Sequence, residues 1–329
     1  MPENGDVQAA TQKMTFFIGT DEAGYGPNLG PLLITATAWR FPPGTSASRC
    51  WALLSNAISE SAPEESEQLH VADSKRIYSS GRSIEPLEKS VLSVLKRLNH
   101  TPSTFRELGT AVAGNAFLAA VDREKCLAST PIDLPLKTNL ELIERSSRRL
   151  KNTLRAASIE LITVRSRVIF PAEFNQLVET EGSKGRVLSM ATLKMVADIV
   201  QDERLESAQI ICDKHGGRNR YDALLSEAFE DQLVFRLEEG RQLSRYRMKQ
   251  LEFRFQTGAE EHLPVAVASM VSKYLREVAM LEFNAFWREF VPELKATQGY
   301  PVDAARFLRD IESELERQQI PKEQIWRRR

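Results

Sequence analysis

The stretch from Phe16 to Pro31 constrains this chain more than any other part of the sequence. A short apolar run leads into the adjacent carboxylates Asp21 and Glu22, and three glycines and two prolines follow within nine residues. An apolar run that ends at turn residues predicts a buried strand. Side chains alternate between the faces of a strand, so the two acids diverge unless the glycine turn bends the chain between them.

Two acids at the end of a core strand, above a glycine turn, suit Mg²⁺ or Mn²⁺, which prefer oxygen ligands. The alternative is a strand that ends in a solvated acidic turn. For an Asp-Glu pair taken alone that alternative is the commoner case, because short motifs often match by chance. The pair therefore needs support from other parts of the sequence.

Composition places the chain among ordinary globular proteins. It has 329 residues, of which 42% are hydrophobic and 27% charged, so it forms one large domain with insertions or two modest ones. Its apolar stretches fall well short of the ~20 residues that a membrane span requires. The polar residues 1–13 predict a disordered tail without a signal-peptide core. A net charge of −1 means that any surface for nucleic acid must be locally positive.

The cysteines indicate a reducing compartment. Cys50, Cys126 and Cys212 lie far apart, and the sequence contains no Cys-x-x-Cys motif. This usage fits the cytoplasm and argues against a zinc site built on cysteine pairs.

Hydrophobic periodicity predicts an α/β fold with a mixed sheet flanked by helices, because strand and helix patterns alternate after an initial hairpin. Strands are expected over 15–20, 31–41, 159–170 (as one strand or two), 208–213, 232–238 and 250–256. Helices are expected over 47–60, 84–98, 186–205, 265–290 and 302–317.

Further acids are expected near the first pair. Asp213 ends a second apolar run, and Glu260 and Glu261 precede the long helix. Strand ends and helix starts converge on a common crevice in α/β sheets. Four carboxylates there repel one another unless cations lie between them, and they suit two metal ions ~3.5–4 Å apart. Basic residues placed to hold a phosphate backbone are Lys75, Arg76, Lys214, Arg218, Arg220 and Lys273.

Several motifs resemble, in the same order, those of the type 2 ribonucleases H (ribonuclease HII-like). They span about 15 to 310 and are interrupted by an apparent insertion at 100–157. The motifs are Asp21-Glu22-Ala23-Gly24-Tyr25-Gly26-Pro27-Asn28-Leu29-Gly30-Pro31, Asp73-Ser74-Lys75, Ala191-Thr192-Leu193, Asp213 after its strand, Ala268-Ser269-Met270-Val271-Ser272-Lys273-Tyr274-Leu275-Arg276-Glu277 and Gly299-Tyr300-Pro301.

The resemblance implies a ribonuclease H fold that hydrolyses the RNA strand of RNA–DNA hybrids with divalent metals on four acids. Asp21, Glu22 and Asp213 correspond directly to family acids. The position aligned with the fourth is Ala259, so Glu260 is assigned after a shift of one residue, with Glu261 as the second choice. The substrate-binding residues implied by the resemblance are Gly24, Tyr25, Gly26, Lys75, Lys273 and Tyr300.

Two features depart from the family pattern. Tyr25 stands where the family has arginine, which removes a bidentate phosphate partner. The family tyrosine that precedes the Gly-Tyr element has no counterpart in residues 293–297. The tyrosine at position 25 and the shifted fourth acid leave open a hybrid- or duplex-binding protein that has lost catalysis. A metal-dependent nuclease of related fold that acts on DNA only is a further alternative.

The expected organisation has three parts. Residues 14–290 form a ribonuclease H-like catalytic domain after the tail, and residues 291–329 form a helical extension. The expected activity is a cytoplasmic endonuclease that depends on Mg²⁺ or Mn²⁺.

Overall fold

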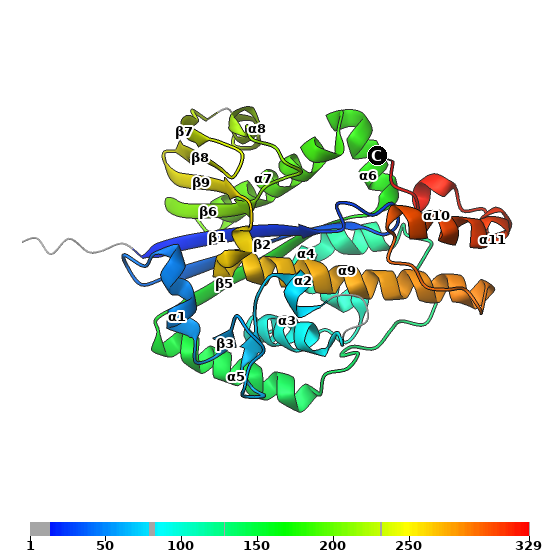
Figure 1. Cartoon of the computed structure of the whole chain (residues 1–329), viewed down its shortest axis with the longest axis horizontal. Helices are drawn as coiled ribbons and strands as arrows, with labels where there is room; N and C mark the ends of the chain where they lie inside the picture. The colour runs from blue at the N-terminus through cyan, green and yellow to red at the C-terminus, as the bar shows by residue number, and fades with distance from the viewer. Residues whose placement is uncertain (1–13, 79–82, 128, 231, 329) are drawn as a thin grey trace, which may run out of the picture.

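A computed structural model describes residues 14–78, 83–127, 129–230 and 232–328. The expected tail at 1–13 lies outside this range. The described chain contains a mixed sheet of seven strands in the order β5-β2-β1-β6-β9-β8-β7 (Figure 1). The strands are β1 (Thr15–Ala23), β2 (Leu32–Phe41), β5 (Glu160–Ile169), β6 (Ser207–Asp213), β7 (Phe235–Glu239), β8 (Leu243–Met248) and β9 (Gln250–Gln256).

Strand directions set the architecture of the sheet. β2 runs antiparallel to both β1 and β5, which confirms the expected initial hairpin. β6 runs parallel to β1 and to β9, while β7 and β8 close the far edge as antiparallel strands. The carboxyl ends of β1, β6 and β9 therefore lie together at one edge of the sheet.

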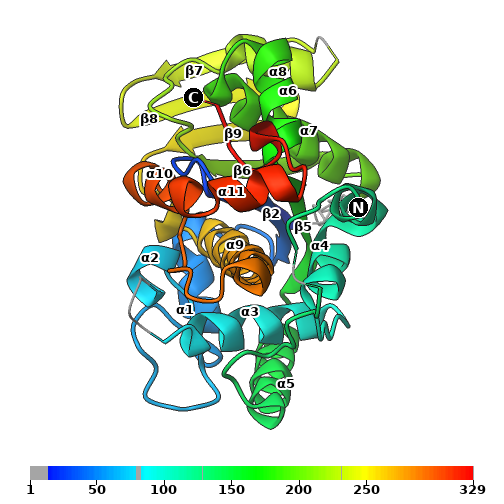
Figure 2. The same cartoon turned by 90° about the vertical axis from the view of Figure 1, so that its right-hand side faces the viewer.

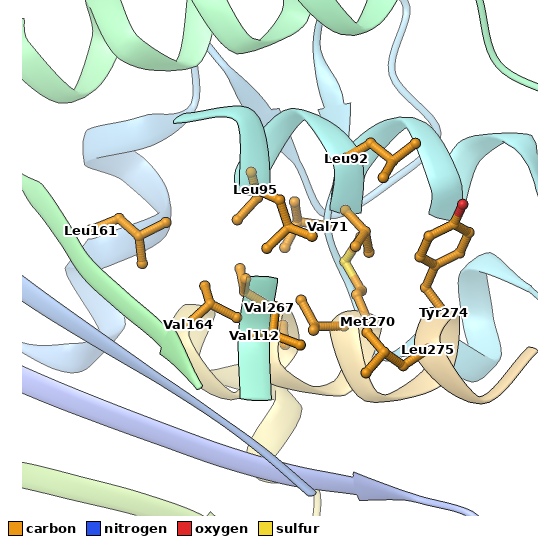
Figure 3. Close-up of a cluster of buried hydrophobic side chains, with 14 of the residues drawn as sticks. Val71, Leu92, Leu95, Val112, Leu161, Val164, Val267, Met270, Tyr274 and Leu275 are labelled. Carbon is orange, nitrogen blue, oxygen red and sulfur yellow. The ribbon is translucent and has the colours of Figure 1, made fainter. Parts of the chain in front are cut away.

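Helices cover both faces of the sheet, so the expected mixed α/β class is confirmed (Figures 1 and 2). One core lies under α9 and includes Met270 and Tyr274, shown in Figure 3. The other lies under α7 and includes Leu193 and Val196. The helices of the first face are α3 (Glu85–Arg97), α4 (Phe105–Val121), α5 (Leu140–Ala156) and α9 (Leu263–Phe290); those of the second are α6 (Pro171–Glu181), α7 (Lys184–Asp202) and α8 (Asp222–Ala228).

The start of α9 touches the backbone of β1 at Gly19. A Cβ atom at this position would lie 2.3 Å from both the Pro264 carbonyl carbon and the Val265 nitrogen. Thr37 on the neighbouring strand donates a hydrogen bond of 2.7 Å to the Pro264 carbonyl oxygen. Glycine at position 19 thus allows a helix to begin directly on the sheet.

The first half of the sheet and its neighbours differ in places from the expected elements, and one strand of the sheet was not expected. The first strand continues to Ala23, because β2 pairs with it residue by residue to that point. The expected helix over 47–60 is a 3₁₀ turn and a short helix, since residues from Ile58 pair with a second small strand. β8 was not expected, because a single residue with positive φ, Lys249, joins it to β9. The short elements of this region are η1 (Ala47–Arg49), α1 (Cys50–Leu54), β3 (Ile58–Ser59), β4 (Leu69–His70) and α2 (Ser74–Ile77).

Residues after 290 pack against the outer half of α9. Trp287, Phe307 and Ile311 share a separate apolar cluster with Leu29 of the loop after β1. The single helix expected over 302–317 is divided at Ile311. The elements here are α10 (Pro301–Asp310), α11 (Glu312–Arg317) and η3 (Lys322–Gln324), and η2 (Ala259–Glu261) precedes α9. The division into catalytic domain, insertion and extension stays a prediction.

Candidate metal centre and nucleic-acid interface

Three carboxylates from distant parts of the sequence meet at the carboxyl edge of the sheet. Thr20 is paired with Cys212 across the parallel strands β1 and β6. The next residues, Asp21 and Asp213, therefore lie side by side on the same face of the sheet. Glu260 joins them, and the three offer oxygen atoms that lie within 4.8 Å of one another.

The loop after β9 brings Glu260 to this group. β9 lies beside β6 up to the pair Asp213 and Gln256, and Gly258 then turns the chain with a φ of 68°. The Ala259 amide donates to Asp213 Oδ1 at 3.4 Å, which ties η2 to the end of β6.

Glu261, the second choice for the fourth acid, points away from the group. Its Oε1 accepts a hydrogen bond of 2.7 Å from Gln256 Nε2 and lies 3.4 Å from His262 Nε2. The side chain is 64% exposed. The structure thus places Glu260 beside the other acids and Glu261 outside them.

Glu22 is separated from the three because the strand stays extended through it. Phe17 belongs to the core under α9 and Ile18 to the core under α7. The alternation along β1 therefore places Asp21 on the α9 face and Glu22 on the opposite face. Burial and, next, the nearby Asp213 carboxylate raise the pKa of Glu22 to about 7, while the charge of Lys75 acts in the opposite direction. Glu22 is therefore close enough to interact with Asp213 through its charge. It does not belong to the group whose carboxylate oxygens lie within 4.8 Å of one another.

All three acids of the group have raised pKa values. Burial, followed by the charge of Glu22, raises the pKa of Asp21 well above its ordinary value. Burial likewise raises the pKa of Asp213 and of Glu260. Carboxylates held this close without a countercharge favour protons or cations. A set of carboxylate oxygens fits Mg²⁺ or Mn²⁺.

The Asp-Ser-Lys motif places a basic group against these acids. Asp73 caps α2 by accepting a hydrogen bond of 2.9 Å from the Lys75 amide, and Ser74 accepts one of 3.0 Å from Ser269 on α9. Burial opposes the charge of the Lys75 ammonium, but Asp73, Glu260, Asp21 and Asp213 outweigh it and raise the pKa of the lysine.

Two serines of α9 support Asp21 and were not assigned a role from the sequence. A hydrogen bond from Ser269 lowers the pKa of Asp21 and so partly opposes the effect of burial. Ser272 donates to the Asp21 carbonyl oxygen at 3.2 Å. Polar residues three apart on an otherwise apolar helix face are the signal that identifies such a pair.

Tyr25 of the glycine turn lies against two segments on the α7 side. A Cβ atom on Gly216, in the loop after β6, would lie 2.8 Å from the Tyr25 hydroxyl. The Lys184 ammonium at the start of α7 lies 4.8 Å from the centre of the Tyr25 ring. The charge of Arg218 lowers the pKa of Tyr25, although burial and Glu22 raise it overall. Lys184 and Arg218 thus contribute positive charge near Tyr25, and Glu22 contributes negative charge.

Tyr300 lies on the other side of the same turn. The Asn28 amide donates to the Gly299 carbonyl oxygen at 2.7 Å, and a Cβ atom on Gly26 would lie 3.9 Å from Tyr300 Cε1. The Tyr300 side chain is 55% exposed. In both views the loop after β1, in dark blue, lies beside α10 (Figures 1 and 2).

The expected basic residues Lys214 and Lys273 are engaged within the protein. Lys214 Nζ donates to the Gly240 carbonyl oxygen at 2.5 Å and to Asn219 Oδ1 at 3.1 Å, so it holds the loop after β6. Lys273 Nζ lies 2.5 Å from Glu277 Oε1 and 5.4 Å from the centre of the Tyr78 ring. A role for Lys273 in substrate binding stays a prediction.

The raised pKa of Glu22 predicts how stability depends on pH without metal. Its pKa rises from an ordinary 4.5 to about 7 in the folded protein, so the folded state binds this proton more tightly than the unfolded state. The free energy of unfolding should therefore fall as the pH rises from 4.5 to about 7. Urea denaturation in the presence of a chelator should show this decrease with pH in the wild type. The decrease should be shallower in Glu22→Gln. Equal slopes would contradict the prediction.

The strand arrangement decides the fold. A three-stranded antiparallel unit, β5-β2-β1, continues through β1 into the parallel strands β6 and β9. The fold is ribonuclease H-like. None of the described helices combines the length and the apolarity that a bilayer span requires.

A structural comparison aligns this chain with solved structures of ribonucleases H at low sequence identity. No protein-family model matches the sequence, and no curated protein matches it. Ribonuclease HII of Archaeoglobus fulgidus, in a complex with PCNA, is 14% identical over 95% of this chain and 94% of its own, with a TM-score of 0.41. Ribonuclease H2 of Pyrococcus horikoshii is 13% identical over 94% and 92%, with a TM-score of 0.40. Bst-RNase HIII in complex with Mn²⁺ is 15% identical over 96% and 67%, with a TM-score of 0.41.

Proposed function

We propose that this protein is a divalent-metal-dependent endoribonuclease that hydrolyses the RNA strand of RNA–DNA hybrids. The observation that carries the proposal is the meeting of Asp21, Asp213 and Glu260 within 4.8 Å. Asp21 and Asp213 stand in segments that resemble family motifs, and Glu260 lies one residue from the position of the fourth family acid. Mutually repelling carboxylates favour a cation between them, and the edge that holds them also carries the glycine turn and Lys75.

Asp21, Asp213 and Glu260 would hold Mg²⁺ or Mn²⁺, with Glu22 beside them. Such ions, when bound, lower the pKa of a water molecule and stabilise the departing oxyanion of a phosphodiester. The Lys75 ammonium offsets part of the negative charge when the acids are deprotonated. Ser269 and Ser272 fix the Asp21 carboxyl and carbonyl groups, so the acid is oriented before substrate binds.

Substrate recognition would fall to the turn between β1 and β2. Backbone amides of Gly24 to Gly26 are suited to a 2′-hydroxyl, the group that distinguishes RNA from DNA. The exposed Tyr300 ring beside Gly26 offers an apolar face to a sugar. Lys184 and Arg218 around Tyr25 would contribute the phosphate attraction that the missing arginine does not. The cytoplasm stays the proposed location, and Cys50, Cys126 and Cys212 are all unpaired.

The proposal predicts Mn²⁺-dependent cleavage of a labelled hybrid at internal positions of its RNA strand. The same assay with an all-DNA duplex and with a chelator separates the alternatives. Salt-dependent hybrid binding without any turnover would support the binding-only protein. Equal cleavage of the all-DNA duplex would support the DNA nuclease, and either result would contradict the proposal.

A further inference from the structure

A buried arginine, Arg327, connects the segment after η3 to the glycine turn. Arg327 is 1% exposed. Its Nη2 atom donates hydrogen bonds to the carbonyl oxygens of Gly24 and Pro27. One guanidinium nitrogen therefore holds both ends of the turn that the proposed function assigns to substrate.

Backbone bonds join the same two segments. The Arg327 amide donates to the Asn28 carbonyl oxygen at 2.8 Å, and Asn28 Nδ2 donates back to the Arg327 carbonyl oxygen at 3.1 Å. Leu29 and Trp326 form an antiparallel bridge. The segment is thus paired with the loop like a short extra strand, and the side chain of Arg327 is fixed in place.

Helix α6 also contacts the segment that contains Arg327. Asn175 on α6 donates through Nδ2 to the Trp326 carbonyl oxygen at 2.9 Å, and its Oδ1 accepts from the Arg328 amide at 2.8 Å. The Arg327 guanidinium also lies 5.0 Å from the centre of the Phe174 ring. The arginine is therefore braced by the α7-side layer of the fold as well as by the loop.

The bond to Gly24 determines where a neighbouring amide points. In a trans peptide the carbonyl and the following N–H point in opposite directions. Because the Gly24 carbonyl is drawn inward to Arg327, the Tyr25 N–H points outward. This amide donates to nothing within the described part of the chain, so it remains available to a ligand.

The charge of Arg327 is costly in this position. Among the described residues no carboxylate pairs with it, and its Nε and Nη1 atoms lack acceptors. Burial, followed by the charge of Arg276, lowers the pKa of Arg327 to about 9. Arg276 is 2% exposed and donates to the Gln298 carbonyl oxygen at 2.8 Å. Burying two guanidinium groups close together destabilises a fold relative to apolar side chains of similar size.

We infer that Arg327 is a positioning residue of the substrate-binding turn, which presents the Tyr25 amide to the sugar-phosphate backbone of the hybrid. The inference rests on the proposed function for its ligand. It explains how a chain with tyrosine at position 25 keeps positive charge beneath the turn: the charge comes from a distant segment and acts through the backbone. Arg327 itself does not touch substrate, because it is buried.

Arg327→Met tests this, with Arg328→Met as the matched control. Arg328 is adjacent, but its side chain is 54% exposed and pairs with Glu179 on the surface. Three readouts are combined. They are hydrogen–deuterium exchange of the 24–30 peptide in the free protein, affinity for a labelled hybrid in an Asp213→Asn background that does not cleave it, and stabilisation by Mn²⁺ of the protein with Asp213 intact.

We expect Arg327→Met to accelerate exchange in the 24–30 peptide and to weaken hybrid affinity roughly tenfold. Mn²⁺ should still stabilise the Arg327→Met protein that keeps Asp213, as it does the wild type. Arg328→Met should leave all three unchanged. Arg327→Lys, which keeps the charge without the forked donors, is the second variant if Arg327→Met does not fold, and it should show the same accelerated exchange.

Unchanged exchange in both Arg327 variants would overturn the inference, and so would faster exchange with unaltered hybrid affinity. If the Asp213→Asn protein does not bind the hybrid at all, the proposed function fails. The exchange comparison then still decides whether Arg327 holds the turn.

Discussion

Replacing Asp213 by asparagine should lower Mn²⁺-dependent cleavage of an RNA–DNA hybrid by about a thousandfold, because bound metal contributes several kcal/mol of transition-state stabilisation. Asparagine preserves the shape of the side chain and one oxygen atom but removes the charge. The stabilisation of the protein by Mn²⁺ should shrink in parallel. Single-turnover cleavage and thermal unfolding with and without Mn²⁺ measure the two effects.

The same variant should be more stable than the wild type in the absence of metal. Burial and neighbouring acids raise the pKa of Asp21, Glu22 and Glu260, and removing one charge relieves part of this repulsion. Glu261→Gln is the control, because its side chain is exposed and turned toward His262. Cleavage by Asp213→Asn at the wild-type rate would contradict the proposed metal centre, as would an equal loss in Glu261→Gln.

Replacing Gly19 by alanine should cost about 3 kcal/mol of unfolding free energy and lower the Tm by about 6 °C. The added Cβ would lie 2.3 Å from two backbone atoms at the start of α9. Backbone cannot rotate away as a side chain can, so α9 must shift from the sheet. Since η2 directly precedes α9, Glu260 should move with it, and Mn²⁺ should stabilise this variant less than the wild type.

Gly44→Ala is the matched control for this prediction. Gly44 has a φ of 72° and nothing within 4 Å of an added Cβ, so only the conformational penalty of about 1 kcal/mol applies. Chemical denaturation gives both values. A cost at Gly19 no larger than the cost at Gly44 would show that the start of α9 is not fixed by its contact with β1.

Periodicity and motif order predicted the alternation of strands and helices and the initial hairpin. The apolar runs that end at Asp21 and Asp213 are read directly from the sequence, because a buried strand must be apolar up to the point at which it leaves the core. Helix ends such as those of α3 and α9 were likewise close to expectation. β8 was not predicted, because a single residue, Lys249, connects it to β9. Such a short turn has little compositional signal.

What the sequence by itself determined is which acids stand at strand ends and in what order the motifs follow. Tertiary structure alone decided which carboxylates meet, because that depends on the register of β1 against β6 and on the turn at Gly258. It set Glu260 inward and Glu261 outward, and it divided Asp21 from Glu22 across the sheet, since one residue reverses the face of an extended chain. It also brought Arg327 under a turn some 300 positions earlier, a contact between segments whose local patterns contain no information about each other.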